Sequence, residues 1–247
     1  MKAIDKARRD SRVSSLLEEL DSKTKLKFSQ SKEPGWGSSY GEGIYRITYS
    51  GCRHPSASLA HELLHVKTQL SGYKRIRIGI SSVDQTESFN RFMTCLDNEL
   101  QHHKFYEEFI SLGFEPHQFY MDEDTETERY LRQEIDYGHE KLIDSVICLF
   151  SIIAPGGAMA SSTIEELKTK LYSVNGGAYS ESLQKIEELV ASWARSPSFD
   201  AVPTTKGIML AMAPLQNMTW FGFEATDRPP NQGFFVDMMF EVQKPER

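Results

Sequence analysis

The sequence predicts an α+β fold that is mostly helical, with a small sheet beside one of the helices. Three observations predict it. Long segments such as 85–112 and 126–153 carry apolar residues every three or four positions, as amphipathic helices do. Short segments such as 43–49 and 73–81 alternate apolar with polar residues, as half-buried strands do. Glycine and proline separate these segments, so we expect compact elements joined by short turns.

The first half of the chain should alternate helices and strands. A glycine-rich stretch, residues 35–43, precedes the second strand, and we interpret it as a mobile hairpin at the rim of a cleft. Ser56 or Ser58 can cap the next helix, and Gly72 stands where a helix should end. The predicted elements are, in order, helix 2–21, strand 26–29, strand 43–49, helix 56–71 and strand 73–81.

The second half should be mainly helical until its last thirty or so residues. Pro155-Gly156-Gly157 stops a long helix and marks a candidate boundary between a domain at 1–155 and an α+β part at 156–247. The alternative is that 156–247 completes the same domain. The predicted elements are helices 85–112, 126–153, 162–172 and 179–195, then strands 218–224 and 234–242.

Composition and charge exclude several classes of protein. The chain has 247 residues with a net charge of −7, which argues against nucleic acid as its main partner. No apolar run approaches the roughly 20 residues that cross a membrane, and the N-terminus lacks the apolar core of a signal peptide. Three widely spaced cysteines favour a reducing compartment. We therefore expect a soluble cytoplasmic protein, whose oligomeric state the sequence leaves open.

His61, Glu62 and His65 form an H-E-x-x-H motif within the predicted helix 56–71. Residues i and i+4 lie one turn apart on a helix, so both imidazoles can reach one metal ion. Glu62 then lies beside the remaining coordination position, where it can take a proton from water. The motif predicts a zinc site with a catalytic carboxylate.

The apolar pattern of the same helix predicts which face of the helix carries these histidines. Four apolar residues recur at i, i+4, i+7 and i+11 and define the stripe that should face the core. At about 100° per residue, the two histidines fall on the opposite side, so they should face solvent or a cleft. The stripe consists of Leu59, Leu63, Val66 and Leu70.

The segment from residue 43 to about residue 103 resembles the zinc peptidases known as zincins. The resemblance rests on the His-Glu-Leu-Leu-His run and on the predicted strand before it. It implies a zincin-like domain in which His61 and His65 hold Zn²⁺ and Glu62 is the base. It also implies that a strand edge holds an extended peptide substrate.

A catalytic zinc needs a third protein ligand and an open position for water. The predicted helix 85–112 supplies the candidates. Glu99 is the first choice, because Asn98-Glu99 resembles the pair that carries the third ligand in the gluzincin branch of zincins. Glu99 also lies at the edge of an apolar stripe, where a carboxylate is costly unless it is paired or binds metal. His102 is the alternative, giving a three-histidine site, and His103 is a further candidate.

The sequence thus predicts a zinc metallopeptidase, a hydrolase that cleaves a peptide or protein substrate with Glu62 as general base. The run Phe89-Asn90-Arg91-Phe92 is loosely similar to the ImmA/IrrE-like peptidases, although Ser88 stands where that group has a glutamate. This resemblance implies an enzyme that cuts one particular regulator. Two alternatives stay open: a non-enzymatic interaction module with a structural or vestigial zinc site, and a metal-dependent amidase acting on a small molecule.

Overall fold

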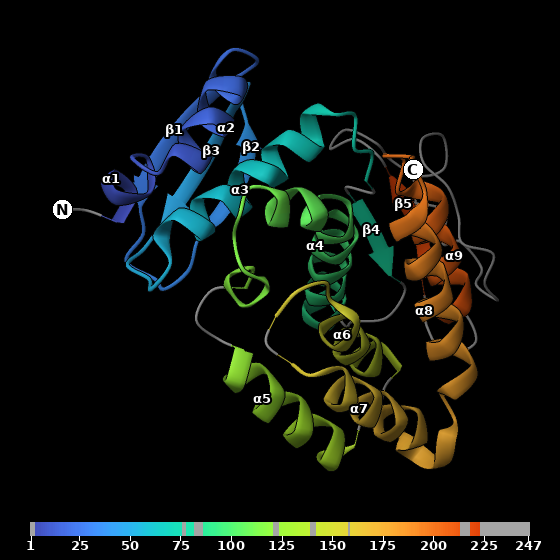
Figure 1. Ribbon diagram of the computed structural model, residues 1–247. Helices are drawn as coiled ribbons and strands as arrows, with labels where there is room; N and C mark the ends of the chain where they lie inside the picture. The colour runs from blue at the N-terminus through green and yellow to red at the C-terminus, as the bar shows by residue number, and fades with distance from the viewer. Residues whose placement is uncertain are drawn as a thin grey trace, which may run out of the picture. The chain divides into compact units, whose positions relative to one another are not determined.

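The computed structural model describes residues 3–75, 78–81, 86–120, 124–138, 142–157, 159–212 and 218–222. Within these ranges helices dominate and the strands form two small sheets, which confirms the predicted α+β class (Figure 1). The helices are α1 (Ala3–Ala7), α2 (Ser11–Asp21), α3 (Pro55–Leu70), α4 (Thr86–Ser111), α5 (Asp124–Tyr137), α6 (Leu142–Ile153), α7 (Ser161–Ser173), α8 (Ser180–Arg195) and α9 (Val202–Met212). The strands are β1 (Lys25–Gln30), β2 (Gly37–Gly41), β3 (Ile44–Tyr49), β4 (Ile78–Ser81) and β5 (Met218–Gly222), with short 3-10 helices η1 (Pro116–Gln118) and η2 (Val174–Gly177).

The chain forms two compact units, each assembled from three separate segments. The first unit comprises residues 1–72, 101–129 and 154–160, and the second comprises residues 73–100, 130–153 and 161–247. Helix α4 contributes to both, because the division falls between Leu100 and Gln101. The division therefore differs from the predicted boundary near residue 155, since the chain passes repeatedly between the units.

The sheet of the first unit has the strand order β1-β3-β2. Strand β1 runs parallel to β3, and β2 pairs with β3 in an antiparallel hairpin that confirms a hairpin in the glycine-rich stretch. Its turn residues Glu42 and Gly43 have φ values of 55° and 76°, as a two-residue hairpin turn with the twist of the strands requires. Along β3, Tyr45, Ile47 and Tyr49 are buried, so one face of this strand packs on the core.

Helix α3 packs against α1, α2 and β2. Leu59, Leu63 and Val66 are fully buried, whereas Leu70, the last member of the predicted stripe, is 39% exposed. The predicted start of the helix was wrong. The first residue is Pro55, whose fixed φ and missing N–H suit that position, so no serine caps the helix. Gly72 has a φ of 92°, which confirms the predicted end.

Two segments predicted as single helices are each divided. Within 2–21, Asp10 is extended and caps α2 by accepting a hydrogen bond from the backbone N–H of Arg12. Within 126–153, helix α5 ends at Tyr137, and Gly138 takes a φ of 75° that a continuing helix cannot accommodate. The apolar periodicity continues across both breaks, which is why it did not reveal them.

The second unit holds the remaining helices and a two-stranded antiparallel sheet of β4 and β5. Strand β5 confirms most of the predicted strand 218–224, and the predicted strand 234–242 lies outside the described residues. Helix α9 was not predicted, although it buries Ile208, Met209 and Met212. No helix in the described ranges is both long and apolar enough to cross a membrane.

Candidate metal centre

Three histidines from two helices meet in the first unit. His61 and His65 come from α3, and His102 comes from α4. Each offers one ring nitrogen, and these three atoms all lie within 4.8 Å of one another. Among the described residues, this is the group of ligand side chains that is arranged to hold a metal ion.

The geometry of the cluster is close to that of a three-histidine metal site. The ring centroids are 5.0 Å apart for His61 and His65, 4.9 Å for His61 and His102, and 5.1 Å for His65 and His102. The Nε2 atoms of His61 and His65 are 3.2 Å apart. Two ligands bound at about 2.05 Å to a tetrahedral zinc ion would lie roughly 3.3 Å apart. The observed spacing therefore fits zinc with little rearrangement.

Hydrogen bonds hold the Nδ1 atoms of His65 and His102. His65 Nδ1 is 3.1 Å from Gln101 Oε1, and His102 Nδ1 is 3.3 Å from the Tyr120 hydroxyl. His102 Nε2 and His61 Nδ1 are buried and have no hydrogen-bond partner within the described ranges. A buried ring nitrogen without a partner is costly, and a metal ion bound to His102 Nε2 would remove that cost.

Aromatic side chains surround the three imidazoles. Phe119 lies 4.6 Å from the ring of His61 and Phe105 lies 4.8 Å from that of His65, measured between ring centroids. His65 and His102 are buried, while His61 keeps part of its surface exposed. The ring nitrogens themselves are enclosed, since His61 Nδ1 and His102 Nε2 are both buried.

Burial also keeps His61 and His102 in the form that binds metal. The pKa of His102 is held well below its ordinary value, first by burial and then by the charges of the three neighbouring histidines. The pKa of His61 is likewise lowered by burial and by His65, with the backbone of Phe119 acting weakly in the opposite direction. Neutral imidazoles are the form that coordinates metals, so no proton has to be displaced near neutral pH.

Glu62 is buried on the same helix, with only 7% of its surface exposed. Burial raises its pKa to about 7, and hydrogen bonds from the side chain and backbone of Ser38 oppose that rise. Ser38 belongs to β2, the edge strand of the sheet, so the hairpin fixes this carboxyl group. A carboxyl group with a pKa near 7 is suited to exchange protons at neutral pH.

The structure brings together some of the predicted ligands and not others. His61 and His65 lie together as the motif predicted, and the third member of the group is His102, the alternative candidate. Glu99, the first choice, is 4% exposed on α4 and does not belong to the group, and neither does His103. Whether Glu99 or His102 joins the other two histidines depends on which face of α4 turns toward α3. The sequence does not determine that rotation.

Gln101 and Tyr120 were not singled out in the sequence. Gln101 directly precedes His102 and is 2% exposed, and a buried amide next to a candidate ligand is a signal that could have found it. Tyr120 lies beyond α4, shortly after η1, and no sequence pattern connects it with the motif. Only the folded chain brings its hydroxyl to His102.

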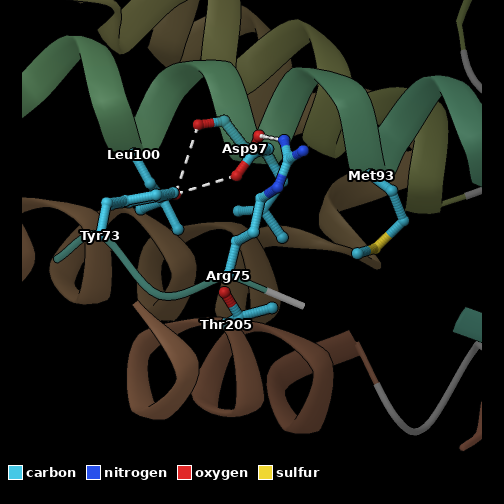
Figure 2. Close-up of a pocket in the computed structure, with 7 residues that line it drawn as sticks. Tyr73, Arg75, Met93, Asp97, Leu100 and Thr205 are labelled. Atoms are coloured by element: carbon cyan, nitrogen blue, oxygen red, sulfur yellow. Dashed lines mark hydrogen bonds and ion pairs between the residues drawn. The ribbon is translucent and has the colours of Figure 1, made fainter. Parts of the chain in front are cut away.

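A separate small pocket lies in the second unit, with a volume of about 10 Å³, enough for roughly one water molecule. Figure 2 shows Asp97 at its centre, where it accepts a hydrogen bond of 3.0 Å from the Tyr73 hydroxyl and pairs with Arg75 at 2.5 Å. Tyr73, Arg75 and Asp97 already bind one another, so we assign no function to this pocket.

No family model, no curated protein and no solved structure matches this chain. Function must therefore be inferred from the geometry of the three histidines and of Glu62.

Proposed function

We propose that this protein is a zinc-dependent peptidase in which His61, His65 and His102 hold the metal and Glu62 is the general base. The observation that carries the proposal is the convergence of three ring nitrogens within 4.8 Å, two from the helix that bears Glu62 and one from α4. Three protein ligands leave a fourth position open, as in catalytic rather than structural zinc sites.

The donor set favours zinc. Three neutral imidazole nitrogens at this spacing suit a borderline ion such as Zn²⁺ better than Mg²⁺ or Ca²⁺, which prefer oxygen ligands. When bound, the metal would supply Lewis-acid polarisation of the scissile carbonyl and of a water molecule.

The residues of the chain perform the proton transfers. Ionised Glu62 removes a proton from the attacking water and then delivers it to the leaving amine. Its pKa of about 7 lets it both accept and release that proton near neutral pH. The two hydrogen bonds from Ser38 hold the carboxylate in place while its charge changes.

A structural metal site is the second candidate, favoured by the burial of His65 and His102 and by the aromatic wall around them. In that case the protein would act through its surface as an interaction module. A buried carboxyl group with a raised pKa is costly in such a site and brings no benefit, which favours the enzyme. An amidase acting on a small molecule would use the same residues.

Metal content tests the site. Mass spectrometry of wild-type protein purified without chelator should find about one zinc per chain, because the proposed site holds a single ion. His61→Ala and His102→Ala should lose that zinc, and Glu99→Ala should retain it. Loss of zinc from Glu99→Ala with retention by His102→Ala would overturn the ligand assignment.

Hydrolysis tests the enzyme. Zinc-loaded wild type should cleave members of a peptide library, and Glu62→Gln should reduce the rate by at least about 10²-fold while binding zinc normally. Equal cleavage by wild type and Glu62→Gln would refute the mechanism. Normal zinc content with no cleavage of peptides or small amides would favour the structural site.

A further inference from the structure

We propose that Gln101 and Tyr120 are positioning residues, which orient His65 and His102 so that each presents its Nε2 to the metal. The inference rests on the metal site of the proposed function and is independent of whether the site hydrolyses peptides. Each residue contacts the Nδ1 of one histidine, the atom that faces away from the proposed ion.

Gln101 determines which nitrogen of His65 carries the proton. Its Oε1 lies 3.1 Å from His65 Nδ1 and can only accept a hydrogen bond, so Nδ1 must donate. A neutral imidazole has one proton, so with that proton on Nδ1 the lone pair of Nε2 can bind a metal. That Nε2 faces the Nε2 of His61 at 3.2 Å, where the metal would bind. If the amide were turned so that its NH₂ group faced His65, Nδ1 would have to accept the hydrogen bond and the ring proton would lie on Nε2. That proton would block metal binding at Nε2.

Gln101 is also well placed to hold the ring still. It is 2% exposed, so water does not compete for its amide group. It lies on α4 next to His102, whereas its partner His65 lies on α3. A single turn of α4 therefore supplies both a ligand and the group that orients a ligand of the other helix.

Tyr120 plays the equivalent part for His102. Its hydroxyl lies 3.3 Å from His102 Nδ1, and the Nε2 of that ring is buried without a hydrogen-bond partner in the described ranges. A hydroxyl can accept as well as donate, so it can accept a hydrogen bond from Nδ1–H, and the lone pair of Nε2 then points to the proposed ion. Partners of this kind fix the tautomer and direction of metal-binding histidines, and losing one typically weakens metal binding about 10–100-fold.

The test measures zinc affinity by competition with a chromogenic chelator. Gln101→Met should weaken zinc binding about 10–100-fold, while Gln101→Glu, which keeps an acceptor at the same place, should restore wild-type affinity or exceed it. Tyr120→Phe should weaken zinc binding about 10-fold, since only one hydrogen bond is lost. The matched control is Tyr106→Phe, because Tyr106 packs on the same Phe119 ring and, within the described part of the chain, the hydrogen bonds to Nδ1 of His65 and His102 come from Gln101 and Tyr120.

A second measurement separates orientation from general loss of structure. Nitrogen-15 NMR of ring-labelled, chelator-treated protein should find the Nδ1-protonated tautomer for His65 and His102 in the wild type and in Tyr106→Phe. Gln101→Met should move His65 alone toward a mixture of tautomers, and Tyr120→Phe should move His102 alone.

The zinc-binding and cleavage results together distinguish failure of the positioning role from failure of the proposed function. Tight zinc binding that is unchanged in both Gln101→Met and Tyr120→Phe would overturn the positioning role and leave the peptidase proposal standing. If the variants bind zinc more weakly than the wild type, and the wild type binds zinc but cleaves no peptide, the positioning role is supported. The same result counts against the peptidase proposal. A wild type that takes up no zinc would overturn both.

Discussion

Glu62 is a carboxyl group in a place that favours its neutral form. The surrounding protein covers nearly all of it, and the hydrogen bonds from Ser38 stabilise its charge. Its pKa of about 7, against an ordinary value of 4.5, means that the folded chain holds a proton there which the unfolded chain releases. Ionised Glu62 therefore destabilises the metal-free protein.

The first prediction concerns Glu62→Gln in metal-free protein. Between about pH 4.5 and pH 7 the folded state binds more protons than the unfolded state, so the free energy of unfolding of the wild type falls as pH rises. Glutamine cannot ionise, so the variant should be more stable than the wild type at pH 8, by on the order of 3 kcal/mol. The difference in free energy of unfolding between the variant and the wild type should be much smaller at pH 5.

Urea unfolding in the presence of chelator at the two pH values measures this difference. Glu42→Gln is the control, because the Glu42 side chain is 85% exposed and its replacement should change stability by less than about 0.5 kcal/mol at either pH. A gain for Glu62→Gln of equal size at pH 5 and pH 8 would show that the carboxyl group is not held in its neutral form.

At the scale of elements, the metal centre depends on a short segment that packs behind it. Gly156 follows α6 with a φ of 87° and lies against the segment that carries Phe119. A Cβ added there would lie 2.8 Å from Tyr106 Cε2 and 3.1 Å from Phe119 Cβ. Phe119 in turn packs on the ring of His61, so this glycine is linked to a ligand through a single aromatic residue.

The second prediction follows from that contact. Gly156→Ala should destabilise the protein by about 1–2 kcal/mol through its left-handed backbone and by a further 1–3 kcal/mol, roughly, through the steric clash. Zinc affinity should also fall, because Phe119 must shift against His61. Chemical denaturation and chelator competition measure the two effects.

Gly72→Ala provides the control for backbone strain alone. Gly72 has a φ of 92°, and a Cβ there would meet nothing within 4 Å. This variant should lose only about 1–2 kcal/mol and keep its zinc affinity. Equal losses of stability and of zinc affinity in the two variants would contradict the role of the packed segment.

Elements with a strong local pattern could be predicted from the sequence, and those that depend on a single backbone angle could not. Apolar periodicity in the sequence directly predicts helix α4 and strand β3. The division of 126–153 depends on the left-handed angle of Gly138, since glycine also occurs inside helices. Strand β2 was foreseen only as part of a hairpin, because its sequence is too rich in glycine and serine to resemble a strand.

The same distinction applies to the metal centre. Two ligands one helical turn apart are a local pattern, so His61 and His65 could be identified from the sequence. The third ligand depends on how α4 is rotated against α3, and Glu99 and His102 differ by only three positions on that helix. Tyr120 enters through a loop conformation, which has no sequence signature at all.

For the whole molecule, the third prediction is that zinc stabilises the fold. The ligands come from segments far apart in the chain, so the unfolded state offers no comparable site. Free zinc at about 100 times its Kd should stabilise the wild type by about 2.7 kcal/mol. For a chain of this length, that corresponds to a rise in Tm of roughly 5–10 °C.

Differential scanning calorimetry with and without zinc measures the shift. His102→Ala should show no rise in Tm, and His117→Ala, which removes an exposed histidine outside the cluster, should rise as the wild type does. A zinc-dependent rise that survives in His102→Ala would mean that the metal binds elsewhere.

The interleaving of the two units has a consequence for how the protein is made. The first unit begins at the N-terminus and is completed only by residues 154–160. At a synthesis rate of about 5–20 residues per second, the 82 positions from residue 72 to residue 154 take roughly 4–16 s. For the first part of that time the core around the H-E-L-L-H helix lacks Phe105, Phe109 and Phe119, and the first unit stays incomplete until residues 154–160 are added. We therefore expect nascent chains to engage chaperones, and the proposed zinc site to form only after His102 has been made.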